Sequence, residues 1–128
     1  MNRWYIDSSA AIKLVYEEKE SEALDAYIAT ESVALVSSYL LETEMRRATF
    51  RLALSQEAVT EFLVGVDLYE VPESVFRLAG LIPTPGLRSL DSIHLAAATR
   101  LKVDGILTYD TRMATAAREL GFPVIAPA

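Results

Sequence analysis

The segment WYIDSSA, residues 4–10, combines the end of a strand with the start of a helix. Trp4-Tyr5-Ile6 has the aromatic and β-branched character of a buried strand. Ser8 or Ser9 can cap the apolar segment 10–16 that follows, which has the composition of a helix. Because a serine alone would be enough to begin that helix, Asp7 at the strand end needs a second explanation. We interpret Asp7 as a functional residue.

The composition limits the classes of protein to which the chain can belong. Its 128 residues are enough for a sizeable core, so we expect a single domain over residues 1–128. Apolar residues make up 52% of the chain, which excludes a disordered protein. No apolar run approaches the length of a membrane span, and the N-terminus lacks the features of a signal peptide. We therefore expect no membrane partner.

Charge and cysteine content restrict the kinds of site that the chain can form. The absence of cysteine excludes disulfides and thiolate metal sites, and it fits a cytoplasmic location. The formal net charge is −6, which disfavours binding of nucleic acid through the overall charge of the protein. A polyanionic substrate would have to be held locally, by a basic patch or by metal ions.

Strand-like and helix-like segments alternate along the chain. We predict strands at residues 4–6, 32–37, 67–71, 105–109 and 123–125. We predict helices at residues 10–16, 18–30, 39–54, 57–66, 73–81, 90–101 and 112–120, with a proline-containing loop at 82–87. Continuous apolar strands separated by helices indicate an α/β fold with a parallel sheet covered on both faces.

Several carboxylates are predicted to lie at one edge of this sheet, where ligands bind in parallel α/β folds. Asp7 and Asp110 follow the first and fourth strands, Glu44 lies in the helix after the second, and Asp91 begins the helix 90–101. Gathered carboxylates repel one another and need a compensating cation or protonation. Hard oxygen ligands without thiolates suit Mg²⁺ or Mn²⁺, and such sites carry out phosphoryl chemistry.

Each acid also has an ordinary structural explanation. Asp91 lies in a first helical turn, where an acid is favourable, and Asp7 and Asp110 can each cap the helix that follows. Glu42 and Glu44 point to opposite sides of their helix; we choose Glu44, which lies on the apolar stripe, and expect Glu42 to pair with Arg46. We interpret His94, surrounded in sequence by apolar residues, as a hydrogen-bonded packing residue.

The order of the motifs is more specific than any single residue. The blocks YIDSSA, SSYLLETEMRRA, LRSLDSIHLAAA and ILTYDTRMATAARELGFPVI resemble the PIN domain over essentially the whole chain, and in particular the VapC-type toxins of toxin–antitoxin pairs. The resemblance implies a three-layer α/β/α fold with a central parallel sheet of about five strands. It also implies a Mg²⁺- or Mn²⁺-dependent endoribonuclease that cleaves RNA phosphodiesters with a metal-activated water.

The resemblance also assigns roles to residues. The acids of the family, which are catalytic and bind the metal, match Asp7, Glu44, Asp91 and Asp110. The hydroxyl residues that orient carboxylates or waters match Ser9 and Thr108. Basic residues near these acids are expected to contact the RNA backbone, and they are Arg47, Arg51, Arg88 and Arg112.

The expected partners follow from the same resemblance, which implies a homodimer bound by a VapB-like antitoxin. Two alternatives stay open. One is a PIN-like binding module without catalytic activity. The other is a receiver-type phosphoacceptor domain, which also places Asp at strand ends but needs an acidic pair after the first strand. Here serines follow Asp7, which disfavours the receiver.

Overall fold

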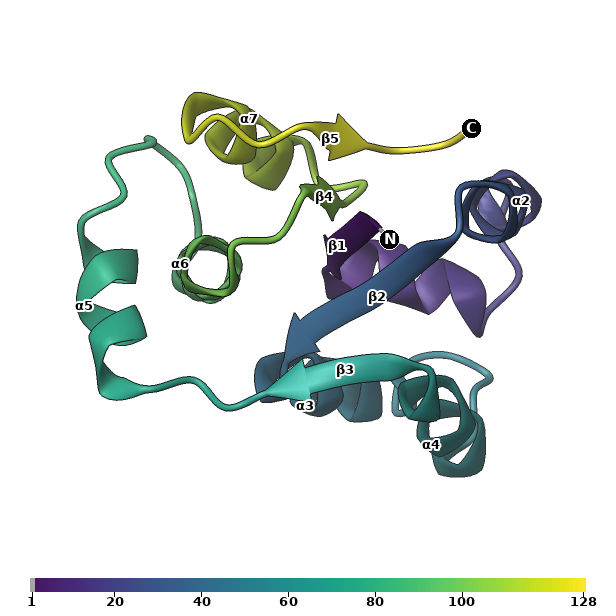
Figure 1. Cartoon of the computed structure of the whole chain (residues 1–128). Helices are drawn as coiled ribbons and strands as arrows, with labels where there is room; N and C mark the ends of the chain where they lie inside the picture. The colour runs from purple at the N-terminus through teal and green to yellow at the C-terminus, as the bar shows by residue number, and fades with distance from the viewer. Residues whose placement is uncertain (1) are drawn as a thin grey trace.

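The strands form one parallel sheet with β1 at its centre (Figure 1). A computed structural model describes residues 2–128. The strands are β1 (Asn2–Ile6), β2 (Val33–Ser38), β3 (Val66–Tyr69), β4 (Gly105–Leu107) and β5 (Val124–Ile125). Their order is β3-β2-β1-β4-β5, and all neighbouring pairs are parallel. The prediction of a central parallel sheet of about five strands is confirmed.

Helices cover both faces of the sheet and complete the three layers (Figure 1). They are α1 (Ser8–Ala11), the 3-10 turn η1 (Ile12–Leu14), α2 (Ser21–Thr30), α3 (Tyr39–Ala48), α4 (Gln56–Val64), α5 (Glu73–Gly80), α6 (Ser89–Leu101) and α7 (Thr111–Glu119). Tyr5 packs with α5, α6 and α7, whereas Trp4 and Ile6 pack with α1 to α4. Successive side chains of β1 therefore contribute to both cores. Within residues 2–128, no helix combines the length and the apolar character needed to span a bilayer.

The strand order reverses between β1 and β4, and this reversal positions the site. From β1 the chain continues outwards through β2 and β3, and it then crosses back to β4 on the other side of β1. A crevice forms at such a point, beyond the C-terminal ends of the strands. Asp7 follows β1 directly and Asp110 comes shortly after β4, so both acids lie at this crevice.

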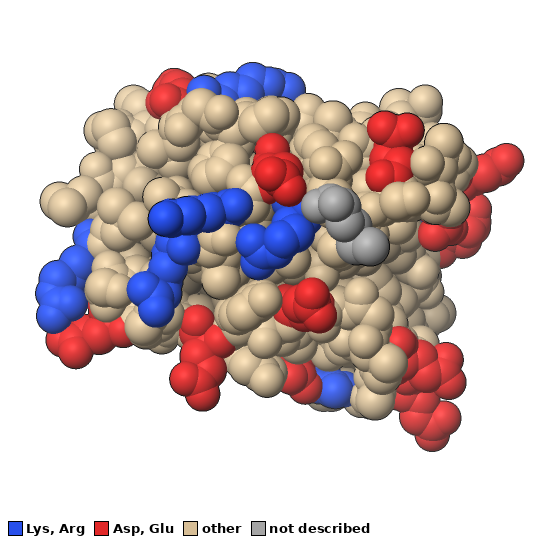
Figure 2. Space-filling model, in the orientation of Figure 1, with Lys and Arg blue, Asp and Glu red and all other residues tan. Residues whose placement is uncertain are grey.

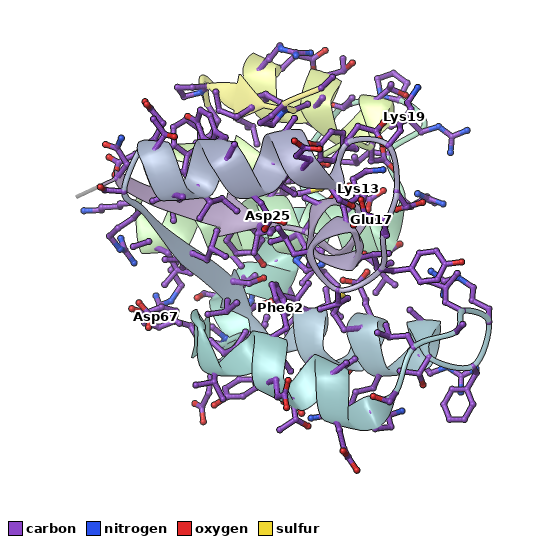
Figure 3. The ribbon with its side chains drawn as sticks, turned by 90° about the vertical axis from the view of Figure 1, so that its right-hand side faces the viewer. Lys13, Glu17, Lys19, Asp25, Phe62 and Asp67 are labelled. Atoms are coloured by element: carbon purple, nitrogen blue, oxygen red, sulfur yellow. The ribbon has the colours of Figure 1, made fainter. Side chains whose placement is uncertain are left out.

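Lys13 connects the segment after β1 to the segment after β4. It lies on η1, beneath α2 in the view of Figure 3, and its ammonium group is 3.0 Å from Glu20 Oε1. The same ammonium group lies 4.8 Å from the centre of the Tyr109 ring, within the range of a cation–π interaction. The Tyr109 hydroxyl in turn donates to the Pro127 carbonyl over 2.6 Å. These contacts fix the backbone on both sides of the crevice.

The helix predicted at residues 39–54 is shorter in the structure, because α3 ends at Ala48. The Thr49 hydroxyl donates to the Arg46 carbonyl over 2.7 Å, and the Gln56 amide donates to the same oxygen over 3.2 Å. Side chains therefore satisfy a carbonyl that a continuing helix would have used. The third strand also differs: it covers Val66–Tyr69 instead of 67–71, and its exposed Asp67 projects from this edge strand (Figure 3). A charge there opposes edge-to-edge pairing with another sheet.

Gly105 is paired with Trp4 across β1 and β4, and it leaves room for the indole ring. A Cβ atom at this position would lie 2.0 Å from Trp4 Cζ3. Gly105→Ala is therefore expected to lower the free energy of unfolding by about 3 kcal/mol, measured by urea denaturation, since a packed core has no space for the added methyl group. The matched control is Gly80→Ala, because nothing lies within 4 Å of its Cβ position. Equal stability of the two variants would contradict this packing.

Candidate active site

The four predicted acids line one hollow of about 490 Å³ at the C-terminal edge of the sheet. Four different segments supply them: Asp7 follows β1, Glu44 lies in α3, Asp91 lies in the first turn of α6, and Asp110 precedes α7. The rest of the lining is made by Ser8, Ser9, Ile12, Arg51, Arg88, Ser89 and Leu90. The fold therefore brings together acids that are far apart in the sequence.

Asp7 is buried, and it accepts hydrogen bonds through both carboxylate oxygens. Its Oδ1 accepts from Ser9 Oγ at 2.7 Å and from the Ala10 backbone N–H at 3.1 Å, and its Oδ2 accepts from Thr108 Oγ1 at 2.7 Å. Asp7 is thus the N-cap of α1. The expectation that Ser8 or Ser9 supplies the cap was wrong, because the aspartate reaches the backbone N–H itself. Capping and a place in the hollow are compatible roles for this side chain.

Burial raises the pKa of Asp7 above its usual range, because its desolvation outweighs the hydrogen bonds that favour the charged form. The two hydroxyl residues that contact it are fixed in turn. Ser9 Oγ accepts from the Tyr109 backbone N–H at 2.9 Å, and Thr108 Oγ1 accepts from the Asp110 N–H at 3.1 Å. Ser9 and Thr108 therefore connect the Asp7 carboxylate to the backbone that leads to Asp110.

Glu44 faces the hollow and contacts His94, whose Nε2 lies 2.5 Å from Glu44 Oε1. The other ring nitrogen, Nδ1, lies 2.6 Å from the Tyr5 hydroxyl. The interpretation of His94 as a hydrogen-bonded packing residue is confirmed by its burial and its two contacts, and the structure adds that one of these contacts holds a side chain of the hollow. Its position three residues after Asp91, on the same face of α6, was the signal in the sequence. Glu42 instead pairs with Arg46 at 2.8 Å, as expected.

Arg88 lies between the remaining two acids. Its Nη2 donates to Asp110 Oδ2 at 2.9 Å, and its Nε donates to Asp91 Oδ2 at 3.3 Å. Burial raises the pKa of Asp91, and the charge of Asp110 raises it further. Asp110 also caps α7 through its Oδ1, which accepts from the backbone N–H groups of Arg112 and Met113. The guanidinium therefore compensates the repulsion between the two carboxylates.

The donor set suits a divalent cation, but the side chains are not arranged around one. Among residues 2–128, no group of three acidic or histidine side chains is close enough to hold a metal ion as it stands. Each acid has another partner: hydroxyls for Asp7, an imidazole for Glu44, and the Arg88 guanidinium for the other two. The four carboxylates nevertheless offer only hard oxygen ligands, which Mg²⁺ and Mn²⁺ prefer. The guanidinium already provides a positive charge between two of them.

The predicted RNA-binding arginines do not all lie at the hollow. Arg51 and Arg88 line it, and Arg47 and Arg51 line an adjoining hollow that shares Ser8, Glu44 and Leu90 with the first. Arg112, at the start of α7, lines neither of these two. On the face shown in Figure 2, several basic side chains lie from the left edge to the centre, with acidic side chains among them and along the right edge. Two of the four arginines, Arg51 and Arg88, therefore line the hollow itself, in spite of the negative net charge of the chain.

Comparison with known proteins finds a matching family and similar curated relatives. The PIN domain family matches residues 4–119. Ribonuclease VapC46 of Mycobacterium tuberculosis (strain ATCC 25618 / H37Rv) is 45% identical over 126 residues, which cover 96% of each chain. Ribonuclease VapC35 of the same strain is 36% identical over 131 residues, again with 96% coverage of both.

Solved structures of low sequence identity share the fold. The crystal structure of Mycobacterium tuberculosis VapC20, described as a Sarcin-Ricin loop cleaving toxin, has a TM-score of 0.77 at 14% identity and covers 96% of this chain and 98% of that one. The structure of VapBC2 from Rickettsia felis, bound to a DNA fragment from its promoter, has a TM-score of 0.78 at 8% identity, covering 98% and 99% of the two chains. The structure of FitAcB from Neisseria gonorrhoeae has a TM-score of 0.70 at 18% identity and 96% coverage of both.

Proposed function

The chain belongs to the PIN-domain family, and on that premise we propose that it is a metal-dependent endoribonuclease, the toxin of a VapBC-type toxin–antitoxin pair. The observation that carries the proposal is the convergence of Asp7, Glu44, Asp91 and Asp110 on one hollow, in a chain 45% identical to a ribonuclease. Family membership removes the receiver-type alternative. A binding module without activity is not favoured by a site in which all four acids are present.

We propose that the four acids hold one or two Mg²⁺ or Mn²⁺ ions. When bound there, a divalent ion would lower the pKa of a water molecule and stabilise the charge on a leaving oxygen. The protein supplies the rest of the chemistry. Ser9 and Thr108 hold the Asp7 carboxylate in a fixed orientation. Because Asp91 and Asp110 come from different segments, their carboxylates can approach a cation from two sides.

The arginines beside the acids are proposed to bind the RNA backbone. Arg51 lies in the hollow and Arg47 in the adjoining one, so both can reach phosphates close to the acids. Arg47 also lies over the Phe50 ring, at 5.4 Å from its centre, and this contact restricts where its side chain can lie. Phosphate contacts of this kind position a nucleic acid without reading its sequence. Arg112 belongs to this group only if RNA extends along α7.

Arg88 is expected to compete with the metal for Asp91 and Asp110. Arg88→Gln should tighten the binding of Mn²⁺ to the RNA-free protein several-fold, because the guanidinium no longer compensates the two carboxylates. Isothermal titration calorimetry measures the affinity. Arg77→Gln is the matched control, since Arg77 pairs with the exposed Glu73 at 2.7 Å on α5. If the Arg88 variant and the control bind Mn²⁺ with equal affinity, the guanidinium does not compete with the cation for Asp91 and Asp110.

The biological part of the proposal concerns partners and location. We propose that residues 1–128 form a single domain that works in the cytoplasm as a homodimer, with RNA as substrate and a VapB-like antitoxin as inhibitor. The test is expression of the chain alone and together with its neighbouring gene. Expression alone should arrest growth and produce new RNA ends, and co-expression should restore growth. Growth unaffected by the chain alone, with no new RNA ends, would contradict the toxin assignment.

A further inference from the structure

A buried series of hydrogen bonds leads from the sheet to the candidate site. The Tyr5 hydroxyl of β1 lies 3.0 Å from Ser38 Oγ at the end of β2 and 2.6 Å from His94 Nδ1 of α6. His94 Nε2 lies 2.5 Å from Glu44 Oε1 of α3. Tyr5 and Ser38 are fully buried and His94 is 1% exposed, whereas Glu44 faces the hollow. Four elements of the fold thus meet in one series of side chains.

When Glu44 is ionised and the imidazole carries one proton, the contacts decide which ring nitrogen holds that proton. The Glu44 carboxylate can only accept, so His94 Nε2 must carry a proton. Burial raises the pKa of Tyr5 to about 12, so its hydroxyl is protonated at neutral pH and has one proton to donate. The shorter contact of this hydroxyl is with His94 Nδ1. The same hydroxyl can instead donate to Ser38 Oγ at 3.0 Å, and the shorter distance to Nδ1 favours His94 as the acceptor of its one proton.

We propose that Tyr5 fixes the tautomer of His94 and thereby holds Glu44 toward the hollow, which makes Tyr5 and His94 positioning residues. This inference rests on the proposed function, in which Glu44 is one of the cation's ligands. A glutamate has three rotatable side-chain bonds, so an unsupported Glu44 would often point away from the other acids. Hydrogen bonds that orient a ligand are typically worth 10- to 100-fold in metal affinity or activity.

The geometry distinguishes this role from that of a buried histidine that only fills space. The imidazole ring packs against the Tyr5 ring at 5.5 Å between ring centres, with the planes at 71°. An aromatic contact of this kind does not require hydrogen bonds from the ring nitrogens. Both ring nitrogens nevertheless form hydrogen bonds with side chains, and one of these side chains, Glu44, lines the hollow. The Tyr5 hydroxyl lies on the far side of the ring from Glu44, so it can influence the carboxylate only through the imidazole.

The tautomer can be observed directly, because His94 is the only histidine in the chain. We expect long-range ¹H–¹⁵N correlation spectra of the metal-free, RNA-free protein at pH 8 to show a proton on Nε2 and none on Nδ1. Tyr5→Phe should give a mixture of the two tautomers. The control Tyr27→Phe should leave the spectrum unchanged, since Tyr27 packs against Trp4 in the other core. A proton on Nδ1 of the wild type would overturn the proposal.

Variants of His94 separate positioning from packing. The side-chain amide of His94→Gln can place its nitrogen near the position of Nε2 and donate to Glu44, whereas His94→Asn reaches only the position of Nδ1. We expect the Asn variant to bind Mn²⁺ roughly tenfold more weakly or worse, and the Gln variant to stay close to the wild type. Thermal unfolding shows whether each variant is folded.

Equal losses of Mn²⁺ affinity in the Gln and Asn variants, with both proteins folded, would contradict the positioning role. Failure of the proposed function has a different signature. If Glu44→Gln leaves Mn²⁺ binding unchanged, Glu44 is not a ligand and the proposed site is wrong. The tautomer measured in the wild type does not depend on that result.

Discussion

Asp7→Asn is expected to reduce divalent-metal-dependent RNA cleavage by about two to three orders of magnitude, the typical loss when a group that stabilises transition-state charge is removed. The amide can keep the structural bonds of the carboxylate. Its oxygen can still accept from Ser9 and the Ala10 N–H, and its NH₂ group can donate to Thr108 Oγ1. The variant therefore loses the charge and one oxygen ligand while the cap of α1 remains.

The measurement is the cleavage rate of a single-stranded RNA at saturating substrate and Mn²⁺, with circular dichroism as the control for folding. A loss of activity in an unfolded variant would not address the role of Asp7, and the preserved bonds make this outcome unexpected. Full activity of folded Asp7→Asn at saturating RNA would show that Asp7 is not part of the catalytic site.

The same variant is expected to be more stable than the wild type at neutral pH in the absence of metal. Burial raises the pKa of Asp7 in the folded protein above the unfolded value of about 3.9. Protonation of Asp7 therefore stabilises the folded state; this stabilisation is complete below the unfolded pKa and is lost as the pH rises through the folded pKa. Thermal unfolding of both proteins between pH 4 and 8 should show a difference in Tm that grows with pH. A wild type more stable than the variant at pH 7 would contradict the raised pKa.

Glu44→Gln and Glu42→Gln are expected to differ by roughly a hundredfold in cleavage rate, although the two residues lie on the same helix. Glu44 lines the hollow and is held by His94, whereas Glu42 makes a partly exposed ion pair with Arg46 at 2.8 Å. An ion pair of this kind contributes little to stability. The Glu42 variant should therefore behave like the wild type in rate and in unfolding. Equal losses in both variants would show that the helix face was chosen wrongly.

The sequence was sufficient for the fold because its patterns are local. Continuous apolar strands alternate with helices, and that alternation specifies a parallel sheet with two covered faces. Helix ends were predicted less well where side chains from another segment decide them. The end of α3 depends on the Gln56 amide, which donates to the Arg46 carbonyl, and no pattern within residues 39–54 indicates that contact.

The convergence of the four acids on one hollow was predictable to the extent that backbone geometry determines it. Helical spacing separated Glu44 from Glu42, and strand ends located Asp7 and Asp110. The partners of these acids depend on contacts between distant segments. His94 is 50 residues from Glu44 in sequence, and the Arg88 guanidinium reaches Asp110 across 22 residues. A side chain's helix face can be calculated from the sequence, but the choice among its possible hydrogen-bond partners needs the packed structure.

The central claim is that four carboxylates form one cation site that drives RNA cleavage. The most direct test measures the rate of RNA cleavage against free Mn²⁺, beside direct calorimetric binding of Mn²⁺ in the same buffer. We predict no cleavage in EDTA, and a rate that rises with the occupancy of the Mn²⁺ site. Cleavage that persists in EDTA, or that reaches its full rate before Mn²⁺ binds, would contradict the claim.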